Sequence, residues 1–87
     1  MDAAQAFGKV LRRLRLEAGY TQEELGFEAD LRRTFISLLE LGQQQPTLTT
    51  ILKLSVPLKH SARDIVAMVE DEIAHEIRGT RRTSRPN

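Results

Sequence analysis

Three short stretches decide the fold of this chain: residues 21–25 (TQEEL), residues 32–37 (RRTFIS) and residues 40–42 (ELG). Thr21 and Glu24 have the spacing of a capping box, in which each side chain accepts a hydrogen bond from a backbone N–H at a helix start. Asp30 falls where a tight turn needs a left-handed backbone, which Asp tolerates better than most residues. Gly42 is the last residue of the third stretch, and glycine often stands just past a helix C-terminus. The pattern predicts two short helices, the second over about 33–41, joined by a tight turn.

Apolar residues at three- and four-residue spacing predict further helices on both sides of this pair. The first covers residues 3–18 and ends at Gly19; its apolar face is Ala6, Phe7, Val10, Leu11 and Leu14. A fourth helix begins after Thr47, which caps it. This helix should end near Val56 or distort there, because Pro57 is out of place in a helix interior.

The last helix begins at a second capping box, Ser61 with Asp64, and runs to about Arg78. Its apolar stripe consists of Ala62, Ile65, Val66, Val69, Ile73 and Ile77. A five-helix domain should bury only the first part of this stripe, so Val69, Ile73 and Ile77 should be exposed unless another chain covers them. We expect a symmetric homodimer whose interface contains Val66, Val69, Ile73 and Ile77. The alternative is that the stripe packs against the first helix of its own chain.

The composition is that of one small domain. The 87 residues are 40% hydrophobic, which is enough for a modest core that association with a second copy would stabilise. The chain has no cysteine, which excludes a disulfide framework and a thiolate metal site. It has neither an apolar run of membrane-spanning length nor a signal-peptide pattern, so we expect a cytoplasmic protein.

Charge is divided unevenly along the chain. Residues 1–76 hold nine Lys and Arg and twelve Asp and Glu, a net charge of −3, whereas residues 77–87 hold four Arg and no acidic residue, a net charge of +4. Any contact with DNA must therefore use a local patch. Residues 79–87, which are rich in Gly, Thr, Ser, Arg and Pro, are expected to form a disordered tail. This tail is either a solvated end or a source of nonspecific attraction to DNA.

Residues suited to catalysis are scarce. His60 and His75 lie far apart, no glycine-rich phosphate loop is present, and the acidic run at 70–72 is better interpreted as a solvated helix face than as a metal site. We therefore expect no enzymatic activity, no cofactor and no metal ion.

The helix over 33–41 has the pattern of a helix that enters the major groove of DNA. Its inward face is Phe35, Ile36 and Leu39, and its outward face is Arg33, Thr34, Ser37 and Leu38. Arg32 and Arg33 lie at its start, where an arginine can pair bidentately with guanine or bind a phosphate. The alternative is a solvated pair of arginines on an ordinary surface helix.

Together these residues resemble the Cro/C1-type helix-turn-helix family, also called the Xre family. The similarity runs from about Phe7 to Val69 and is carried by residues 14–15, 19–25, 34–37, 39–40, 42 and 46–48. It implies an all-α fold: a five-helix lambda-repressor-like helix-turn-helix domain over 1–78 with an extended last helix, followed by the tail at 79–87. Small controllers of restriction–modification operons, some antitoxins and some prophage repressors have this size and layout.

The resemblance also implies roles for individual residues. Gln22 matches a glutamine at the start of the second helix that hydrogen-bonds a DNA phosphate, and helix N-termini favour anions in any case. Arg33 and Thr34 match positions that meet base edges. Arg15 and Glu40 match a pair that ties the first helix to the end of the third.

The chain departs from the family pattern at four places. Arg32 stands where a small capping residue is usual, and it cannot accept the backbone N–H. Leu38, which matches a base-facing position, and Leu41 replace residues that are commonly polar or basic. Residues 43–45 are glutamines where basic residues are frequent, and Asp30 replaces a glycine. The two leucines could be positions poorly tuned for solubility, could pack on a partner or could touch a thymine methyl, and the sequence leaves these possibilities open.

These observations predict a sequence-specific DNA-binding transcriptional regulator. It would act as a homodimer on a palindromic operator, with the helix over 33–41 in the major groove. The residues expected to bind DNA are Gln22, Arg32, Arg33, Thr34, Ser37, Leu38 and Gln43. The alternative is an antitoxin or other protein-interaction module that masks a partner such as a toxin, with DNA binding secondary.

Overall fold

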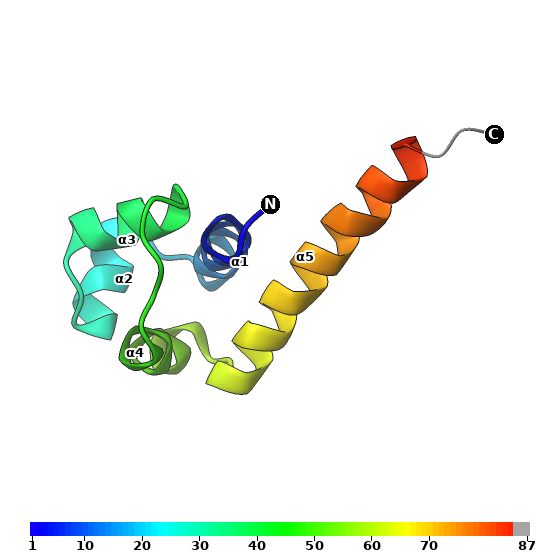
Figure 1. The fold of residues 1–87 in the computed structure, drawn as a ribbon. Coiled ribbons are helices and arrows are strands. Elements are labelled where there is room, and N and C mark those ends of the chain that lie inside the picture. Colours follow the sequence, from blue (N-terminus) through cyan, green and yellow to red (C-terminus); the bar gives the residue numbers. More distant parts are fainter. Residues whose placement is uncertain (85–87) are drawn as a thin grey trace.

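The computed structural model describes the backbone of residues 1–84 and the side chains of residues 1–77. This part of the chain contains five helices and no strand (Figure 1), as the sequence predicts. The helices are α1 (Ala3–Ala18), α2 (Gln22–Ala29), α3 (Arg33–Glu40), α4 (Leu48–Leu58) and α5 (Ala62–Ser84).

The ends of the first two helices follow from local side-chain chemistry. Thr21 Oγ1 accepts a hydrogen bond from the Glu24 N–H at 3.0 Å, and Glu24 Oε1 accepts one from the Thr21 N–H at 2.8 Å. The predicted capping box of α2 is therefore confirmed. Gly19 ends α1 with a φ of 80°, and Asp30 ends α2 with a φ of 57°, both in the left-handed region. A further capping box that we did not predict, Asp2 with Gln5, starts α1.

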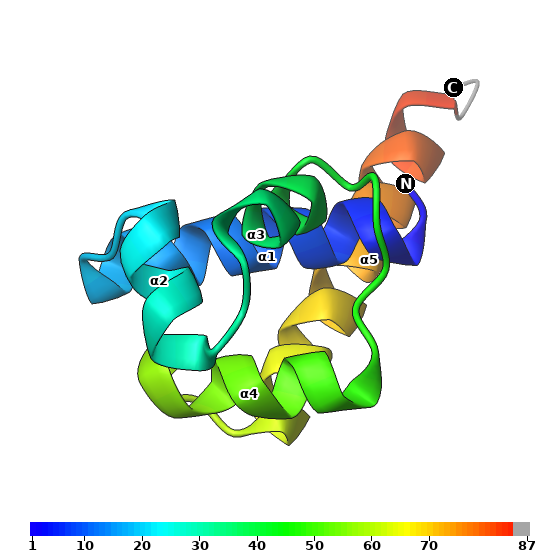
Figure 2. The same ribbon diagram turned by 90° about the vertical axis from the view of Figure 1, so that its left-hand side faces the viewer.

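The core draws on all five helices. Its largest fully buried side chains are Val10, Leu11, Leu25, Ile36, Leu39, Leu54 and Ile65. In Figure 1, α1 is seen end-on between the α2–α3 pair on one side and α5 on the other, and it packs against both α3 and α5. Figure 2 looks onto the side on which α2 and α3 lie, with α4 below them. The helix-turn-helix pair is thus held against a central helix.

Two glycines allow the backbones to approach closely at the points that place α3. A Cβ at Gly8 would lie 2.6 Å from the Leu39 carbonyl oxygen and 2.7 Å from that of Glu40. A Cβ at Gly26 would lie 2.6 Å from the Leu31 carbonyl oxygen. The first contact sets how near α1 comes to the end of α3, and the second sets the α2–α3 turn. Neither role was predicted from the sequence.

The fourth helix ends slightly later than the sequence predicts. α4 continues through Pro57 to Leu58 and ends at Lys59, which has a φ of 60°. Pro57 lies in the last turn, so it removes one hydrogen bond without interrupting a long helix. Pro57 and Leu58 are both buried, and this burial offsets the lost bond.

The predicted boundary of the last helix is also wrong. α5 extends to Ser84 rather than ending near Arg78, so residues 79–84 continue the helix instead of starting a disordered tail. Gly79 lowers helix stability by only about 1 kcal/mol, which does not stop a helix that has already run over the 17 residues 62–78 at that point. Residues 85–87 lie outside the described residues. At the start of α5, the Asp64 N–H donates to Ser61 Oγ at 3.0 Å, which is one half of the expected capping box.

Candidate nucleic-acid interface

The first turns of α2 and α3 meet at one surface hollow. This hollow has a volume of about 400 Å³ and is lined by Arg15, Thr21, Gln22, Glu23 and Arg33. The backbone N–H groups at the start of α2 have no partner earlier in the helix, and together with the helix dipole they favour an anion there. The fold therefore places Gln22 and Arg33, which are eleven positions apart in the sequence, beside one anion-attracting helix end.

The outward face of α3 carries the polar residues that the sequence placed there. Arg32, Arg33 and Thr34 are exposed, and Ser37 is partly buried. Arg32 precedes the helix with a φ of −73° and makes no side-chain capping hydrogen bond, as its chemistry predicts. Its guanidinium therefore remains available for a ligand outside the helix.

Three further residues near α3 differ in exposure. Leu38 is partly buried, whereas Leu41, which follows the last residue of α3, has 64% of its surface exposed. Gln43 lies in the next loop and is exposed, and its N–H donates to the Leu38 carbonyl at 3.0 Å. The apolar side chains at 38 and 41 thus border the polar face of α3.

Arg15 and Glu40 form the predicted link between α1 and the end of α3. Arg15 Nε donates to Glu40 Oε2 at 2.6 Å, and Arg15 Nη2 donates to Glu40 Oε1 at 3.0 Å. The two side chains are only 9% and 4% exposed. The hydrogen bond to Glu40, reinforced by the charge of the carboxylate, raises the pKa of Arg15 above its ordinary value, although burial acts in the opposite direction.

Glu40 also holds Gln22, a contact that the sequence analysis missed. Gln22 Nε2 donates to Glu40 Oε1 at 3.1 Å, so one carboxylate binds side chains from α1 and α2. Arg15 Nη1 donates in addition to the Tyr20 carbonyl at 2.9 Å, which ties down the segment just before α2. This network orients the start of α2 relative to α3. No local signal could have revealed it, because the partners are distant in sequence.

The apolar stripe of α5 is covered less uniformly than expected. Val69 is partly buried and packs against the core, so its predicted exposure is wrong. Ile73 is partly buried as well, so its predicted exposure is also wrong. Val66 and Ile77 are exposed, at 42% and 49%. Arg13 of α1 and Glu72 of α5 add an exposed ion pair at 3.4 Å between the same two helices.

A second apolar face, on α4, was not predicted as exposed. Leu48, Leu52 and Val56 recur every four residues, and 70%, 52% and 77% of their surfaces are exposed. Their spacing in the sequence was visible and places them on one side of a helix. The opposite side of α4, with Leu54 and Leu58, fills the core, and in the described part of the chain none of the three residues of the outer stripe belongs to that core.

Two other kinds of site are absent from the described part of the chain. Within it, no group of three or more His, Asp or Glu side chains is arranged to hold a metal ion. No helix there is both long enough and apolar enough to span a membrane.

Comparison with known proteins agrees with this geometry. A family model described as helix-turn-helix matches residues 11–63. Control protein C.BamHI of Bacillus amyloliquefaciens is 39% identical over 61 residues, which cover 69% of this chain and 75% of that protein.

Two solved structures extend the comparison. The restriction-modification controller protein C.AhdI from Aeromonas hydrophila is 37% identical, with a TM-score of 0.69, and the match covers 71% of this chain and 94% of that one. The clp gene regulator ClgR from Corynebacterium glutamicum has a TM-score of 0.88, and the match covers 95% of this chain and 88% of the ClgR chain. Because the two sequences are only 20% identical, this match shows similarity of fold alone. The resemblance found in the sequence is thereby confirmed: this chain belongs to the Cro/C1-type helix-turn-helix family of DNA-binding transcriptional regulators.

Proposed function

We propose that the protein is a sequence-specific transcriptional regulator that binds double-stranded DNA as a homodimer on a palindromic operator. The observation that carries this proposal is the hollow that Gln22 and Arg33 share. If α3 lies in the major groove of DNA, a phosphate of the DNA backbone that borders this groove would lie at the start of α2. Gln22 would then donate to the phosphate while Glu40 fixes its side chain.

The proposed DNA-binding residues on and beside α3 fall into two groups. One group would read bases, and the other would contact the phosphates of the DNA backbone. Arg33 and Thr34, in the first turn, would meet base edges, and Ser37 and Leu38 would face the next bases along the groove. Arg32 and Gln43 flank the helix and would contact phosphates, which position a protein without reading sequence.

The exposed apolar surface supports the homodimer. Val66 and Ile77 are exposed along α5, with Ile73 and Val69 beside them, so a second α5 packed across a two-fold axis would bury all four. In such a dimer the two α3 helices would read half-sites about 10–10.5 bp apart, or a multiple of that distance.

The proposed division of the chain is a DNA-binding domain over 1–78 and an arginine-rich end over 79–87. The end carries Arg81, Arg82 and Arg85 and no acidic residue, so it could add phosphate attraction that weakens as salt increases. A regulator of this kind would act in the cytoplasm, would need no cofactor and would have no enzymatic activity.

Selecting bound sequences from a random pool of double-stranded DNA tests the proposal. We expect an enriched palindrome whose half-sites have the spacing given above. Enrichment of a single unpaired half-site would contradict the dimeric arrangement. Failure to enrich any sequence, with a protein shown to be folded, would contradict sequence-specific binding.

The second candidate function is that of an antitoxin or other protein-interaction module, with DNA binding secondary. The observation that favours it is the outer stripe of α4, because Leu48, Leu52 and Val56 are exposed and are not part of the proposed α5 interface. A toxin that co-purifies with the protein and loses its activity on binding would support this candidate.

A further inference from the structure

Glu23 brings a negative charge into the hollow where the proposed phosphate and base contacts meet. This hollow, of about 400 Å³, is lined by Glu23 together with Gln22 and Arg33, the residues proposed to hold a phosphate and to read a base. Glu23 is exposed and lies in the first turn of α2. A carboxylate at this point repels every DNA phosphate that approaches the start of α2, whatever the base sequence. By itself, Glu23 therefore lowers the affinity for DNA in general.

The stability of α2 gives only part of the reason for an acidic residue at position 23. The helix dipole favours a negative charge in the first turn, but the effect is modest for an exposed side chain. Glu24 already supplies such a charge in the same turn, where it completes the capping box with Thr21. Glu23 makes no capping contact, yet it is the residue of the two that lines the proposed DNA site.

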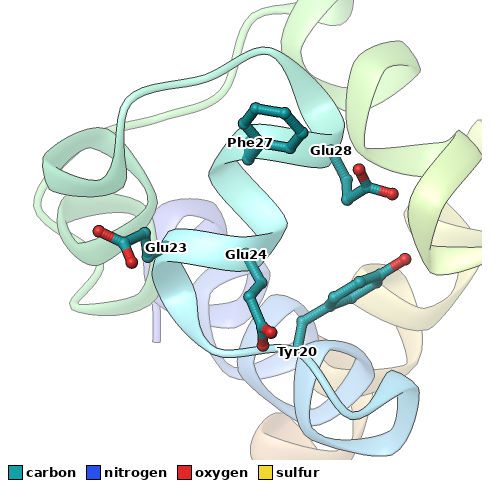
Figure 3. Close-up of a pocket in the computed structure, with 5 residues that line it drawn as sticks. All are labelled: Tyr20, Glu23, Glu24, Phe27 and Glu28. Carbon is teal, nitrogen blue, oxygen red and sulfur yellow. The ribbon is translucent and has the colours of Figure 1, made fainter.

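Glu23 also differs from the other acidic residues of α2 in the direction of its side chain. In Figure 3, the carboxylates of Glu23 and Glu28 lie to either side of the Phe27 ring, which is 84% exposed. Glu23, Glu24 and Glu28 all border a second hollow beside Phe27, but only Glu23 also lines the hollow that contains Arg33. The fold thus places one carboxylate of α2 beside the first turn of α3.

Arg33 offers this carboxylate a partner of opposite charge. Among the residues whose side chains are described, neither Glu23 nor Arg33 belongs to an ion pair, although both line the same hollow. A guanidinium carries five N–H donors in one plane, and a guanine takes only two of them, at its O6 and N7 atoms. The remaining donors can reach a carboxylate on another edge of the group, which fixes the plane of the guanidinium.

We propose that Glu23 is a positioning residue that holds the Arg33 guanidinium in the orientation that pairs with guanine, and so sharpens sequence specificity. This role rests on the proposed function, since it needs Arg33 to read a base. On a site with guanine, Arg33 lies between the base and the Glu23 carboxylate and offsets the repulsion of the phosphates. On other sequences the guanidinium has no pair of base acceptors, and Glu23 competes with the phosphates for it. Glu23 therefore weakens binding to wrong sites more than binding to the operator.

Binding of three fluorescent DNA duplexes to the full chain, followed by anisotropy, tests this role. The duplexes are the selected operator, a scrambled sequence, and the operator with adenine–thymine in place of each guanine–cytosine pair at which Arg33→Ala relaxes the preference. Glu23→Gln keeps the shape of the side chain and removes its charge. This variant should bind the operator as the wild type does and the other two duplexes about two- to fivefold more tightly, the range for one exposed charge pair.

Glu28→Gln is the matched control, because it removes the same charge from the same helix outside the hollow that contains Arg33. It should discriminate between the duplexes as the wild type does. Added to Arg33→Ala, the Glu23→Gln change should tighten binding to all three duplexes equally, because no guanidinium is left to position. A role confined to the stability of α2 would lower the urea midpoint of Glu23→Gln and leave its discrimination unchanged.

The role of Glu23 is overturned if Glu23→Gln alters the affinity for all three duplexes by one factor, or if Glu28→Gln reduces the discrimination as much. Failure of the proposed function gives a different result. If Arg33→Ala relaxes the preference and Glu23→Gln does not, Arg33 reads a base without help from Glu23. If Arg33→Ala relaxes the preference at no position, Arg33 reads no base, and the role of Glu23 is lost with it.

Discussion

Arg15 and Glu40 are joined by two hydrogen bonds, of 2.6 and 3.0 Å, that link the last turn of α1 to the last residue of α3. The same carboxylate accepts a hydrogen bond from Gln22 at the start of α2. Three helices therefore meet at one buried acid. The position of α3 relative to the proposed phosphate site depends on this acid as much as on the apolar core.

Glu40→Ala should lower the free energy of unfolding by about 3–5 kcal/mol, because it leaves the Arg15 guanidinium buried without its counter-ion. Urea denaturation followed by circular dichroism measures this change. Replacing Arg15 and Glu40 together with methionine should cost less than Glu40→Ala alone, since no charge is then left unpaired. Glu17→Ala, on an exposed position of α1, should change stability by no more than about 0.5 kcal/mol. A loss below about 1 kcal/mol for Glu40→Ala would show that the pair is not structural.

Gly8→Ala should destabilise the fold by about 1–3 kcal/mol, as overpacking does. The added Cβ would lie 2.6 Å from the Leu39 carbonyl oxygen, which is backbone and cannot rotate away. Separation of α1 from the end of α3 would also disturb the Arg15–Glu40 contact. Thermal unfolding checks this, with Glu70→Ala on the exposed side of α5 as the control. A variant as stable as the wild type would mean that α1 and α3 lie farther apart than the structure shows.

Ile77→Asp should shift the protein from dimer toward monomer, because it places a charge in the proposed α5 interface. Loss of an apolar contact worth about 1.5 kcal/mol per copy would weaken dimerisation at least tenfold, which sedimentation can measure. Ile77 is half exposed, so the helices should remain folded. Leu16→Asp, on the outer side of α1, should leave the dimer intact. A dimer that survives Ile77→Asp but is lost in Val56→Asp would move the interface to the outer stripe of α4.

Features with a local chemical cause were predictable from the sequence. The capping box at Thr21 and the left-handed backbone at Gly19 and Asp30 depend on neighbouring residues, and each is present as predicted. Arg15 and Glu40 were paired correctly only through the family resemblance, because they are 25 positions apart. The arginines and Thr34 were placed on the outer face of α3 by helical periodicity.

Features decided by packing between distant segments escaped prediction. Burial of Pro57 and Leu58 carried α4 past the proline, and packing against the core covered part of Val69. The hydrogen bond from Gln22 to Glu40 and the close approach at Gly8 need three-dimensional proximity that no spacing in the sequence reveals. The exposure of Phe27 is of the same kind, since only the fold determines which side of a short helix lacks a partner.

The most direct test of the central claim, that α3 reads DNA bases while the start of α2 holds a phosphate, compares two variants on the selected operator. Arg33→Ala should cost about 1–3 kcal/mol of binding free energy on that site and relax the preference at one base pair. Gln22→Ala should instead weaken all sequences about equally. The matched control is Arg63→Ala on α5, a helix that α1 separates from α3 (Figure 1). This variant should change neither the affinity for the operator nor the selected sequence. If Arg33→Ala leaves both the affinity and the selected sequence unchanged, α3 does not read DNA as proposed.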